Sequence, residues 1–392
     1  MVTLTNAENV LKTVYLDVLQ NQLNTGVNPF YSLVKKSSDD IYGKEVRMLS
    51  PVGVNGGISA GDEAGALPAA SGNGYVQFVT TLKNLYGQIE ITDKAIRASQ
   101  NDSGAFLSLL QAEMEGLLDA SKLNLGRMLF GNGTGKIARV KNAVTNNATI
   151  PLLNPADVRL FTVGQKVDFI KGATVHASGK RITGINYDTG DIILSEAVSP
   201  PVDCDIYIQD SKDKEIIGLA AIFDSALTSL YGVNKASNPW LKPHAQALTS
   251  PNNEITDLII QKSIDAINER TGNTPDVLIC SAGVRRAYQE YLQTYKRSTD
   301  VMELAGGYKA ISYNGIPLVY DRFCPDGTMY LLNSKDFRFV QLCDWRWLEA
   351  ENGSVLHKID GKAAYTATLV KYAELVCRKP GGQGVITGIK EA

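Results

Sequence analysis

Residues 53–74 read GVNGGISAGDEAGALPAASGNG, and this stretch decides how the rest of the sequence is interpreted. It consists almost entirely of small residues, and Asp62 and Glu63 carry its only charges. Small side chains bury little apolar surface, so the segment cannot build a hydrophobic core of its own. The composition predicts an exposed and adaptable segment, with a disordered linker as the alternative interpretation.

Strand patterns on both sides of this stretch favour a hairpin over a linker. Residues 46–51 read as a short strand, and residues 76–82 alternate as a second strand does. One face of the second strand carries Val76, Phe78, Thr80 and Leu82, and the pattern resumes after Gly87 at Ile89 and Ile91. We therefore expect two strands joined by a flexible tip, as a long hairpin that projects from the body of the protein.

The longest helix is expected after the hairpin. Asp102 and Ser103 are good N-cap residues, and apolar residues then recur every three or four positions, at Phe106, Leu107, Leu110, Met114, Leu117, Leu118, Leu125, Met128 and Leu129. A glycine-rich run over residues 131–135 ends the pattern. The spacing predicts a helix of about eight turns, long enough to act as a spine. A shorter amphipathic helix is expected over residues 6–23.

Two further regions follow the spine. Residues 137–212 contain short strands separated by turn residues, including a hairpin turn over residues 188–190, and predict a small β-barrel or sandwich. From about residue 219 the pattern is α/β, with helices over 254–269 and 281–292, strands over 276–280, 316–320 and 329–333, and a long final strand that ends at Cys377. The turn over residues 324–327 is expected to join the strands 316–320 and 329–333.

The composition shows no strong charge bias. The 392 residues include 39 Lys and Arg against 41 Asp and Glu, a net charge of −2, whereas proteins that hold nucleic acid by bulk electrostatics are basic. The five cysteines form no Cys-x-x-Cys pair, which favours reduced thiols over a disulfide framework or a zinc site. Neither a signal peptide nor an apolar run long enough for a membrane helix is found. We expect a cytoplasmic protein with no membrane partner.

Patterns for catalysis are weak. The sequence contains neither Gly-x-Ser-x-Gly nor His-Glu-x-x-His, and its three histidines lie far apart, at His176, His244 and His357. Residues 131–136 partly match the phosphate-binding loop pattern Gly-x-x-x-x-Gly-Lys-Ser/Thr. However, Phe130 stands at the position of the first glycine, and Ile137 stands at the position of the serine or threonine. We therefore expect no enzyme activity, no cofactor and no metal site. A soluble α/β enzyme is the alternative from a different class.

The order of these parts resembles the major capsid proteins of tailed bacteriophages, the Hong Kong 97-type family, whose fold encapsulins share. Four stretches carry the resemblance: GQIEITDKAI at residues 87–96, NLGRMLFGNGTG at 124–135, GIPLV at 315–319 with PDGTMYLLN at 325–333, and AELV at 373–376. They look like the exit from the extended loop, the end of the spine helix, the axial-domain hairpin and the closing peripheral-domain strand. The resemblance spans nearly the whole chain outside residues 136–213.

The resemblance implies an α+β fold of the Hong Kong 97 type with an inserted small β domain. The implied divisions are an N-terminal arm (1–44), an extended loop (45–92), a peripheral domain with the spine helix (93–135), the inserted β-rich domain (136–213), a peripheral–axial connection (214–250), an axial domain (251–345) and the closing strands of the peripheral domain (346–392). The insertion is a departure from simple members, in which the turn after the spine runs almost directly into a Gly-Leu or Gly-Ile pair, here Gly218-Leu219.

The implied function is self-assembly into the hexamers and pentamers of an icosahedral or prolate head shell. The shell would enclose double-stranded DNA, contacted non-specifically, in a virion assembled in the cytoplasm of a bacterial host. Implied partners are a portal protein, a separate scaffolding protein and a decoration protein. An encapsulin-type nanocompartment is the alternative with the same fold.

Expected assembly contacts lie in the hairpin and on one late strand. They are Gly53, Gly56, Gly57, Asp62, Glu63, Gly72, Gly74, Phe78, Trp345 and Trp347. The two tryptophans alternate around Arg346, which favours packing or a subunit contact over a cofactor site. Some family members join subunits by Lys–Asn isopeptide bonds from the extended loop, but residues 48–82 contain no lysine, so no such bond is expected.

Overall fold

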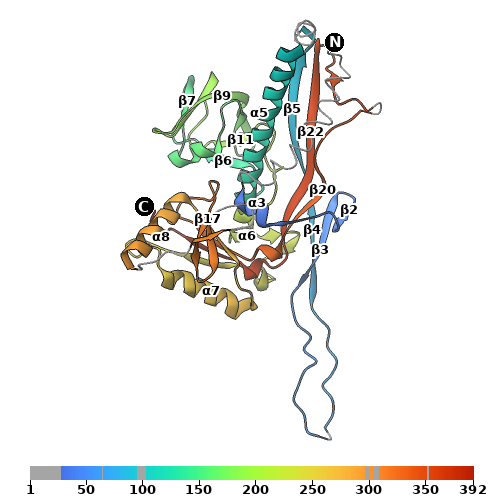
Figure 1. The fold of residues 1–392 in the computed structure, drawn as a ribbon, viewed down its shortest axis with the longest axis vertical. Coiled ribbons are helices and arrows are strands. Elements are labelled where there is room, and N and C mark those ends of the chain that lie inside the picture. The colour runs from blue at the N-terminus through green and yellow to red at the C-terminus, as the bar shows by residue number, and fades with distance from the viewer. Residues whose placement is uncertain (1–27, 64, 95–102, 296–300, 304–308, 351–352) are drawn as a thin grey trace. The chain divides into compact units, whose positions relative to one another are not determined.

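The computed structural model describes residues 28–63, 65–94, 103–295, 301–303, 309–350 and 353–392 (Figure 1). The helix expected over residues 6–23 lies outside the described residues. The described chain divides into two compact units, of which unit 1 comprises Lys83–Leu219 and Trp345–Lys371. Unit 2 comprises the described part of Asn24–Leu82, together with Ala220–Asp344 and Tyr372–Ala392.

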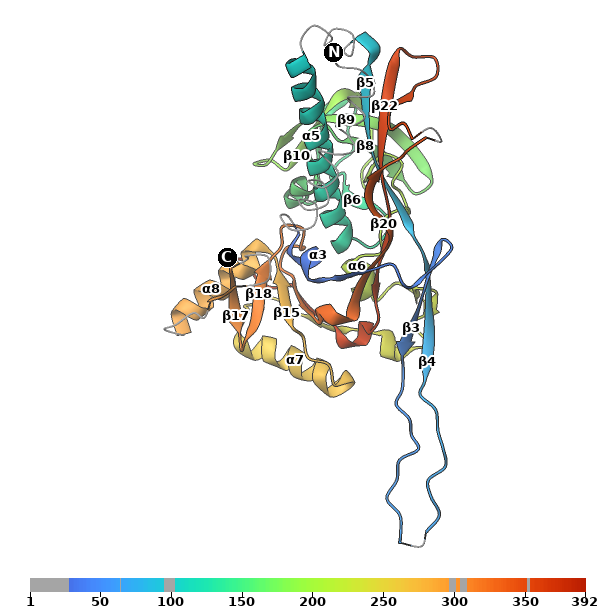
Figure 2. The ribbon, with the colours of Figure 1, turned by 45° about the vertical axis from the view of Figure 1, so that its right-hand side comes forward.

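Unit 1 is organised around the spine helix α5 (Ser103–Phe130) and the strand β5 (Lys83–Thr92). β5 pairs with the long strand β22 (Ala364–Cys377), which also pairs with the short strand β21 (His357–Lys358). Alternate residues of β5 are buried, and Gly87 lets the helix approach, since a Cβ there would lie 2.9 Å from Leu117 of α5. Figure 2 shows β5 and β22 side by side.

The last turns of the spine are buried and end where the sequence predicts. Leu125, Met128 and Leu129 are at most 4% exposed, and Gly131 N donates to Met128 O at 3.0 Å to close the helix. Gly218 is far from the spine in the sequence, and the residue after it, Leu219, begins the short helix α6 (Leu219–Phe223). Gly218 touches the spine so closely that a Cβ would lie 2.4 Å from Met128 O and 2.5 Å from Leu129 O.

Residues 136–208 fold as a closed β-barrel, in the region for which the sequence predicts a small β-barrel or sandwich. Its sheet order is β6-β11-β8-β9-β10-β7, and a bridge between Val140 and Leu152 joins the two outer strands. The strands are β6 (Lys136–Arg139), β7 (Asn147–Pro151), β8 (Lys166–Lys171), β9 (Thr174–Asn186), β10 (Asp191–Val198) and β11 (Asp205–Ile208), with a 3-10 turn η1 (Pro155–Leu160). It has an apolar core of its own, in which Val167, Phe169, Ile182, Ile192 and Ile206 are fully buried.

Both ends of the barrel return to the same point at the foot of the spine. Asp213 N donates to Thr134 O at 2.8 Å, and Arg127 of α5 forms a buried ion pair with Glu215, with 2.5 Å between Nη2 and Oε1. These contacts explain how a long insertion leaves the spine helix undisturbed.

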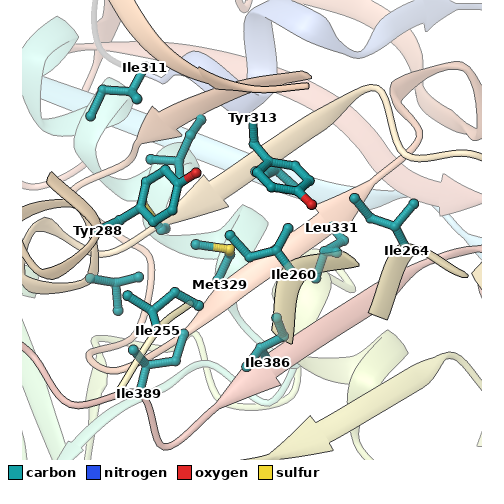
Figure 3. Close-up of a cluster of buried hydrophobic side chains, with 14 of the residues drawn as sticks. Ile255, Ile260, Ile264, Tyr288, Ile311, Tyr313, Met329, Leu331, Ile386 and Ile389 are labelled. Atoms are coloured by element: carbon teal, nitrogen blue, oxygen red, sulfur yellow. The ribbon is translucent and has the colours of Figure 1, made fainter. Parts of the chain in front are cut away.

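The α/β part of unit 2 is a seven-stranded sheet with the order β14-β23-β19-β15-β18-β17-β16. Its strands are β14 (His244–Ala247), β15 (Val277–Cys280), β16 (Val301–Glu303), β17 (Lys309–Tyr313), β18 (Ile316–Tyr320), β19 (Met329–Leu332) and β23 (Gly384–Thr387). Helix α7 (Asp257–Thr271) packs on β14 and β23, and helix α8 (Ala282–Tyr295) packs on β18. Figure 3 shows the apolar cluster formed between the helices and the sheet, which includes Ile260, Tyr288, Met329, Leu331 and Ile386.

One expected pairing in this sheet is wrong. The sequence suggests a hairpin between β18 and β19, but β15 lies between them, parallel to β18 and antiparallel to β19. All four residues of β15 are buried, so it takes the central position, and the hairpin partner of β18 is β17.

The remaining elements of unit 2 are short, and β3 and β4 among them form the base of the hairpin. They are α3 (Pro29–Leu33), β1 (Lys35–Ser37), β2 (Ile41–Tyr42), β3 (Glu45–Pro51), β4 (Tyr75–Thr81), β12 (Ser229–Leu230), β13 (Val233–Asn234) and the 3-10 turns η2 (Pro239–Leu241), η3 (Ser334–Asp336) and η4 (Pro380–Gly382). Strand β20 (Phe337–Trp347) pairs with β1 in parallel, and the boundary between the units falls inside β20 and β22. Residues 346–392, grouped together in the sequence interpretation, are therefore divided between the two units.

Candidate assembly surface

The base of the hairpin is the ribbon of β3 and β4, to which the short strand β2 adds a third strand beside β3. β3 and β4 pair in register from Glu45 opposite Thr81 to Pro51 opposite Tyr75. Alternation in β3 buries Val46, Met48 and Ser50 and turns the intervening residues to solvent. One face of the ribbon therefore packs on the rest of unit 2, and the other face is exposed to solvent.

Phe78 anchors this ribbon inside the subunit. Its side chain is 1% exposed, with its ring centroid 5.4 Å from that of Tyr231 and 6.1 Å from that of Trp240. Val79 N donates to Tyr231 O at 3.0 Å, and Ser50 Oγ donates to Arg378 O at 2.6 Å. Phe78, expected as an assembly residue, is thus placed where it holds the hairpin and where a neighbouring subunit cannot touch it directly.

Beyond the ribbon, residues 52–74 continue as two extended limbs with few internal bonds (Figure 1). Val52 N donates to Gly74 O at 2.9 Å, but between the described residues of 54–72 no hydrogen bond crosses from limb to limb. Val54, Ile58 and Leu67 are 84–91% exposed. A single subunit therefore leaves both apolar side chains and backbone donors and acceptors of the tip in water.

The expected glycines lie along these limbs as predicted. None of Gly53, Gly56, Gly57, Gly72 and Gly74 has a positive φ, so left-handed backbone is not the reason for glycine here. The limbs approach closely at two places, since a Cβ on Gly57 would lie 3.2 Å from Ala69 O and one on Gly74 would lie 3.4 Å from Gly53 N. Small residues thus keep the tip thin.

Asp62 and Glu63 lie at the far end of the tip and are exposed. Asp62 O accepts a bond from Gly65 N at 3.0 Å, which makes the turn. Within the described residues no ion pair holds either carboxylate, so both are available to a partner.

Trp345 and Trp347 are buried and pack inside the protein. They are 3% and 6% exposed, with Arg346 exposed between them, and Lys371 Nζ lies 5.8 Å from the centre of the Trp345 ring. Exposed apolar residues do occur here, namely Leu342 on β20 at 56% and Leu348, directly after the strand, at 44%. The two tryptophans that the sequence pattern selected as assembly contacts therefore lie on the buried side of β20, and not on its exposed side.

A cavity at the base of the hairpin was not predicted. It has a volume of 460 Å³ and is lined by Asp40, Tyr42, Arg47, Met48, Leu49, Gln77, Arg338 and Arg378. Its arginines, Arg47, Arg338 and Arg378, come from three separate segments of the sequence, so no local motif points to the cavity.

Groups with reactive side chains are scattered over the structure. His176 lies exposed on β9, His244 begins β14, and His357 Nε2 lies 3.2 Å from Leu348 O. All five cysteines are free, and burial raises the pKa of Cys204 to about 11 and that of Cys280 to about 12, which makes them poor nucleophiles. Among the described residues no group of acidic, histidine and cysteine side chains could hold a metal ion. None of the described helices is both long and apolar enough to cross a membrane.

Comparison with solved structures identifies the fold. No family model matches the chain, and no curated protein matches it either. A chain of the capsid asymmetric unit of cyanophage A-1(L) does match, with a TM-score of 0.58 at 14% identity over 93% of both chains. The chain has the Hong Kong 97-type capsid fold. The expected fold class is thereby confirmed, with α5 as its spine and β3–β4 as its extended loop.

Two further matches have lower TM-scores. The SrpI encapsulin of Synechococcus elongatus PCC 7942 is 10% identical with a TM-score of 0.49, and 95% of each chain is covered. A structure of Mycobacterium phage Bobi is 11% identical with a TM-score of 0.47, and 99% of this chain and 98% of that chain are covered.

Proposed function

We propose that this chain is the major capsid protein of a tailed phage, which self-assembles into the head shell around double-stranded DNA. The observation that carries the proposal is the extended loop of a capsid fold, residues 52–74, whose limbs are almost without internal bonds. A segment of this kind gains its contacts from another molecule. Its role is structural, and no catalysis is part of it.

The energetics of the tip support docking on a neighbour. Val54, Ile58 and Leu67 are almost fully exposed in the single subunit. Burial of each such side chain contributes about 1.5–3 kcal/mol, so a docked tip adds stability that the free subunit lacks. Unpaired backbone groups in an extended limb can also add to a partner sheet.

Closed shells follow when such contacts repeat around local symmetry axes. Hexamers and pentamers place the same tip in slightly different surroundings, and a thin, glycine-rich tip adapts to both. The net charge of −2 suits a shell that touches packaged DNA without binding it by bulk electrostatics. A portal protein, a separate scaffolding protein and a decoration protein complete the proposed virion, which is assembled in the cytoplasm of the bacterial host.

Size-exclusion chromatography and negative-stain electron microscopy of the recombinant chain test the proposal. Shells or capsomer-sized rings are expected, and a variant with residues 54–72 replaced by a short Gly-Ser turn should stay folded but fail to assemble. Nuclease-protected DNA in shells made during infection would distinguish a phage head from a nanocompartment with an enzyme cargo. If the chain stays a 42.4 kDa monomer and does not assemble with any scaffolding protein encoded in the same genome, the proposal is contradicted.

A further inference from the structure

The cavity at the base of the hairpin is basic. Three arginines, Arg47, Arg338 and Arg378, line it against the single carboxylate of Asp40. Arg47 is partly neutralised, because its Nη2 lies 3.0 Å from Glu45 Oε2 in an exposed pair. The cavity therefore favours an anion.

Arg338 and Arg378 both keep donors that a ligand could use. Arg338 Nη1 donates to Lys335 O at 2.7 Å and to Phe337 O at 2.8 Å, which fixes its guanidinium. Arg378 Nε is buried and has no hydrogen-bond partner within the described chain. A buried donor without a partner is costly, so an incoming acceptor at this position gains from it.

The rim of the cavity is apolar. Tyr42 of β2 and Leu49 of β3 line it, and they are 63% and 57% exposed. A matching ligand thus carries a carboxylate with apolar groups beside it. A phosphate fits less well, because Asp40 repels a dianion more strongly and the rim offers it nothing.

The tip of the same hairpin carries that chemistry. Asp62 and Glu63 are its only charges, and Ile58 and Leu67 stand four residues before and after them, 84% and 91% exposed. The tip cannot reach its own cavity, because Glu63 and Gln77 are separated by an extended limb of roughly 40 Å. A second copy of the chain can supply it.

We propose that the Asp62–Glu63 tip of one subunit docks into the arginine cavity of a neighbouring copy, where the carboxylates meet Arg338 and Arg378. This inference rests on the proposed shell function and names the partner surface that the tip recognises. Charge-assisted hydrogen bonds between arginine and carboxylate then fix the position of the tip on the neighbouring copy. The small residues of the limbs make no such specific contact.

A disulfide cross-link tests the contact directly. In the double variant Glu63→Cys with Gln77→Cys, assembled shells are expected to give a ladder of multimers on a non-reducing SDS gel, which reduction collapses. Docking brings the two positions within the about 7 Å between Cα atoms that a disulfide requires. Controls are Glu63→Cys alone, which reports on the five native cysteines, and Glu63→Cys with Leu258→Cys, an exposed residue of α7.

A neutral tip provides the second measurement. Asp62→Asn with Glu63→Gln alters only exposed side chains, so the subunit should fold as the unaltered chain does. Its shells are expected to dissociate at a lower urea concentration and to lose the salt dependence of the unaltered shells.

Outcomes separate this inference from the proposed function. Shells that form without the cross-link, or that cross-link equally through Leu258→Cys, overturn the docking contact and leave the shell function standing. Inorganic phosphate that stabilises the unassembled chain through Arg378, with no cross-link in shells, would identify an anion site instead. If the unaltered chain forms no shells at all, both proposals fall.

Discussion

At the residue scale, Asp321 gives the fold a pH dependence of known sign. Its carboxyl group is 1% exposed, and burial raises its pKa from 3.8 to about 6, although Phe323 N donates to Oδ1 at 3.0 Å. A raised pKa means that the folded state holds the proton more tightly than the unfolded state does. The stability that this adds is present below about pH 4 and is lost as the pH rises to about 6.

The predicted consequence concerns Asp321→Asn. Between pH 4 and 7 the free energy of unfolding of the natural chain should fall relative to that of the variant by about 3 kcal/mol at most. Urea unfolding of the unassembled chain at several pH values measures the difference, with Asp360→Asn at an exposed position as the control. Parallel curves for the natural chain and Asp321→Asn would refute the assignment.

Gly218 is a second residue with a sharp expectation. A Cβ at this position would overlap the carbonyl oxygens of Met128 and Leu129 at 2.4 and 2.5 Å, so Gly218→Ala should destabilise unit 1 by about 2–3 kcal/mol. Gly116→Ala is the matched control, because nothing lies within 4 Å of the new Cβ and the residue is an exposed position inside α5. It should stabilise the chain by about 0.5–1 kcal/mol. Thermal unfolding that shifts both variants in the same direction would contradict this account.

At the scale of elements, the barrel has a hydrophobic core of its own. It is closed by the Val140–Leu152 bridge and so offers no unpaired outer strand, and Thr134 and Asp213 meet where it leaves the spine. The contacts that hold the foot of the spine, the Arg127–Glu215 pair among them, lie outside the barrel strands.

Excision of the barrel should therefore leave the capsid fold intact. A chain that lacks residues 137–212, with a short Gly-Ser linker in their place, is expected to keep a cooperative unfolding transition and to assemble. Circular dichroism and electron microscopy measure the two properties, and residues 136–213 expressed alone should fold as a barrel. Loss of the transition in the shortened chain would show that the spine depends on the insertion.

At the scale of the whole molecule, the shell should be held by non-covalent contacts. An isopeptide bond needs an amine, and residues 48–82 contain no lysine. Purified mature shells heated in SDS with a reducing agent are expected to run as a single band at 42.4 kDa. A ladder above the monomer that survives these conditions would show a covalent link from another part of the chain.

The sequence by itself determined the elements whose signals are local. Alternation placed β3 and β4, spacing of apolar residues placed α5, and the small residues of 53–74 marked the tip of the hairpin. The glycine-rich run over residues 131–135 marked the C-terminal end of the spine for the same reason, since helix termination depends on a few neighbouring residues. The order of these elements was enough to indicate the capsid fold.

Only the tertiary structure decided which distant segments meet. β15 lies between β18 and β19 because it is buried on both faces. The sequence of the turn that follows β18 does not indicate that another strand separates β18 from β19. The burial of Trp345 and Phe78 likewise follows from neighbours such as Tyr231 that the alternating pattern does not name. Arg338 and Arg378 line one cavity with Arg47 because long-range packing brings three segments together, and no periodicity in a linear sequence records such a meeting.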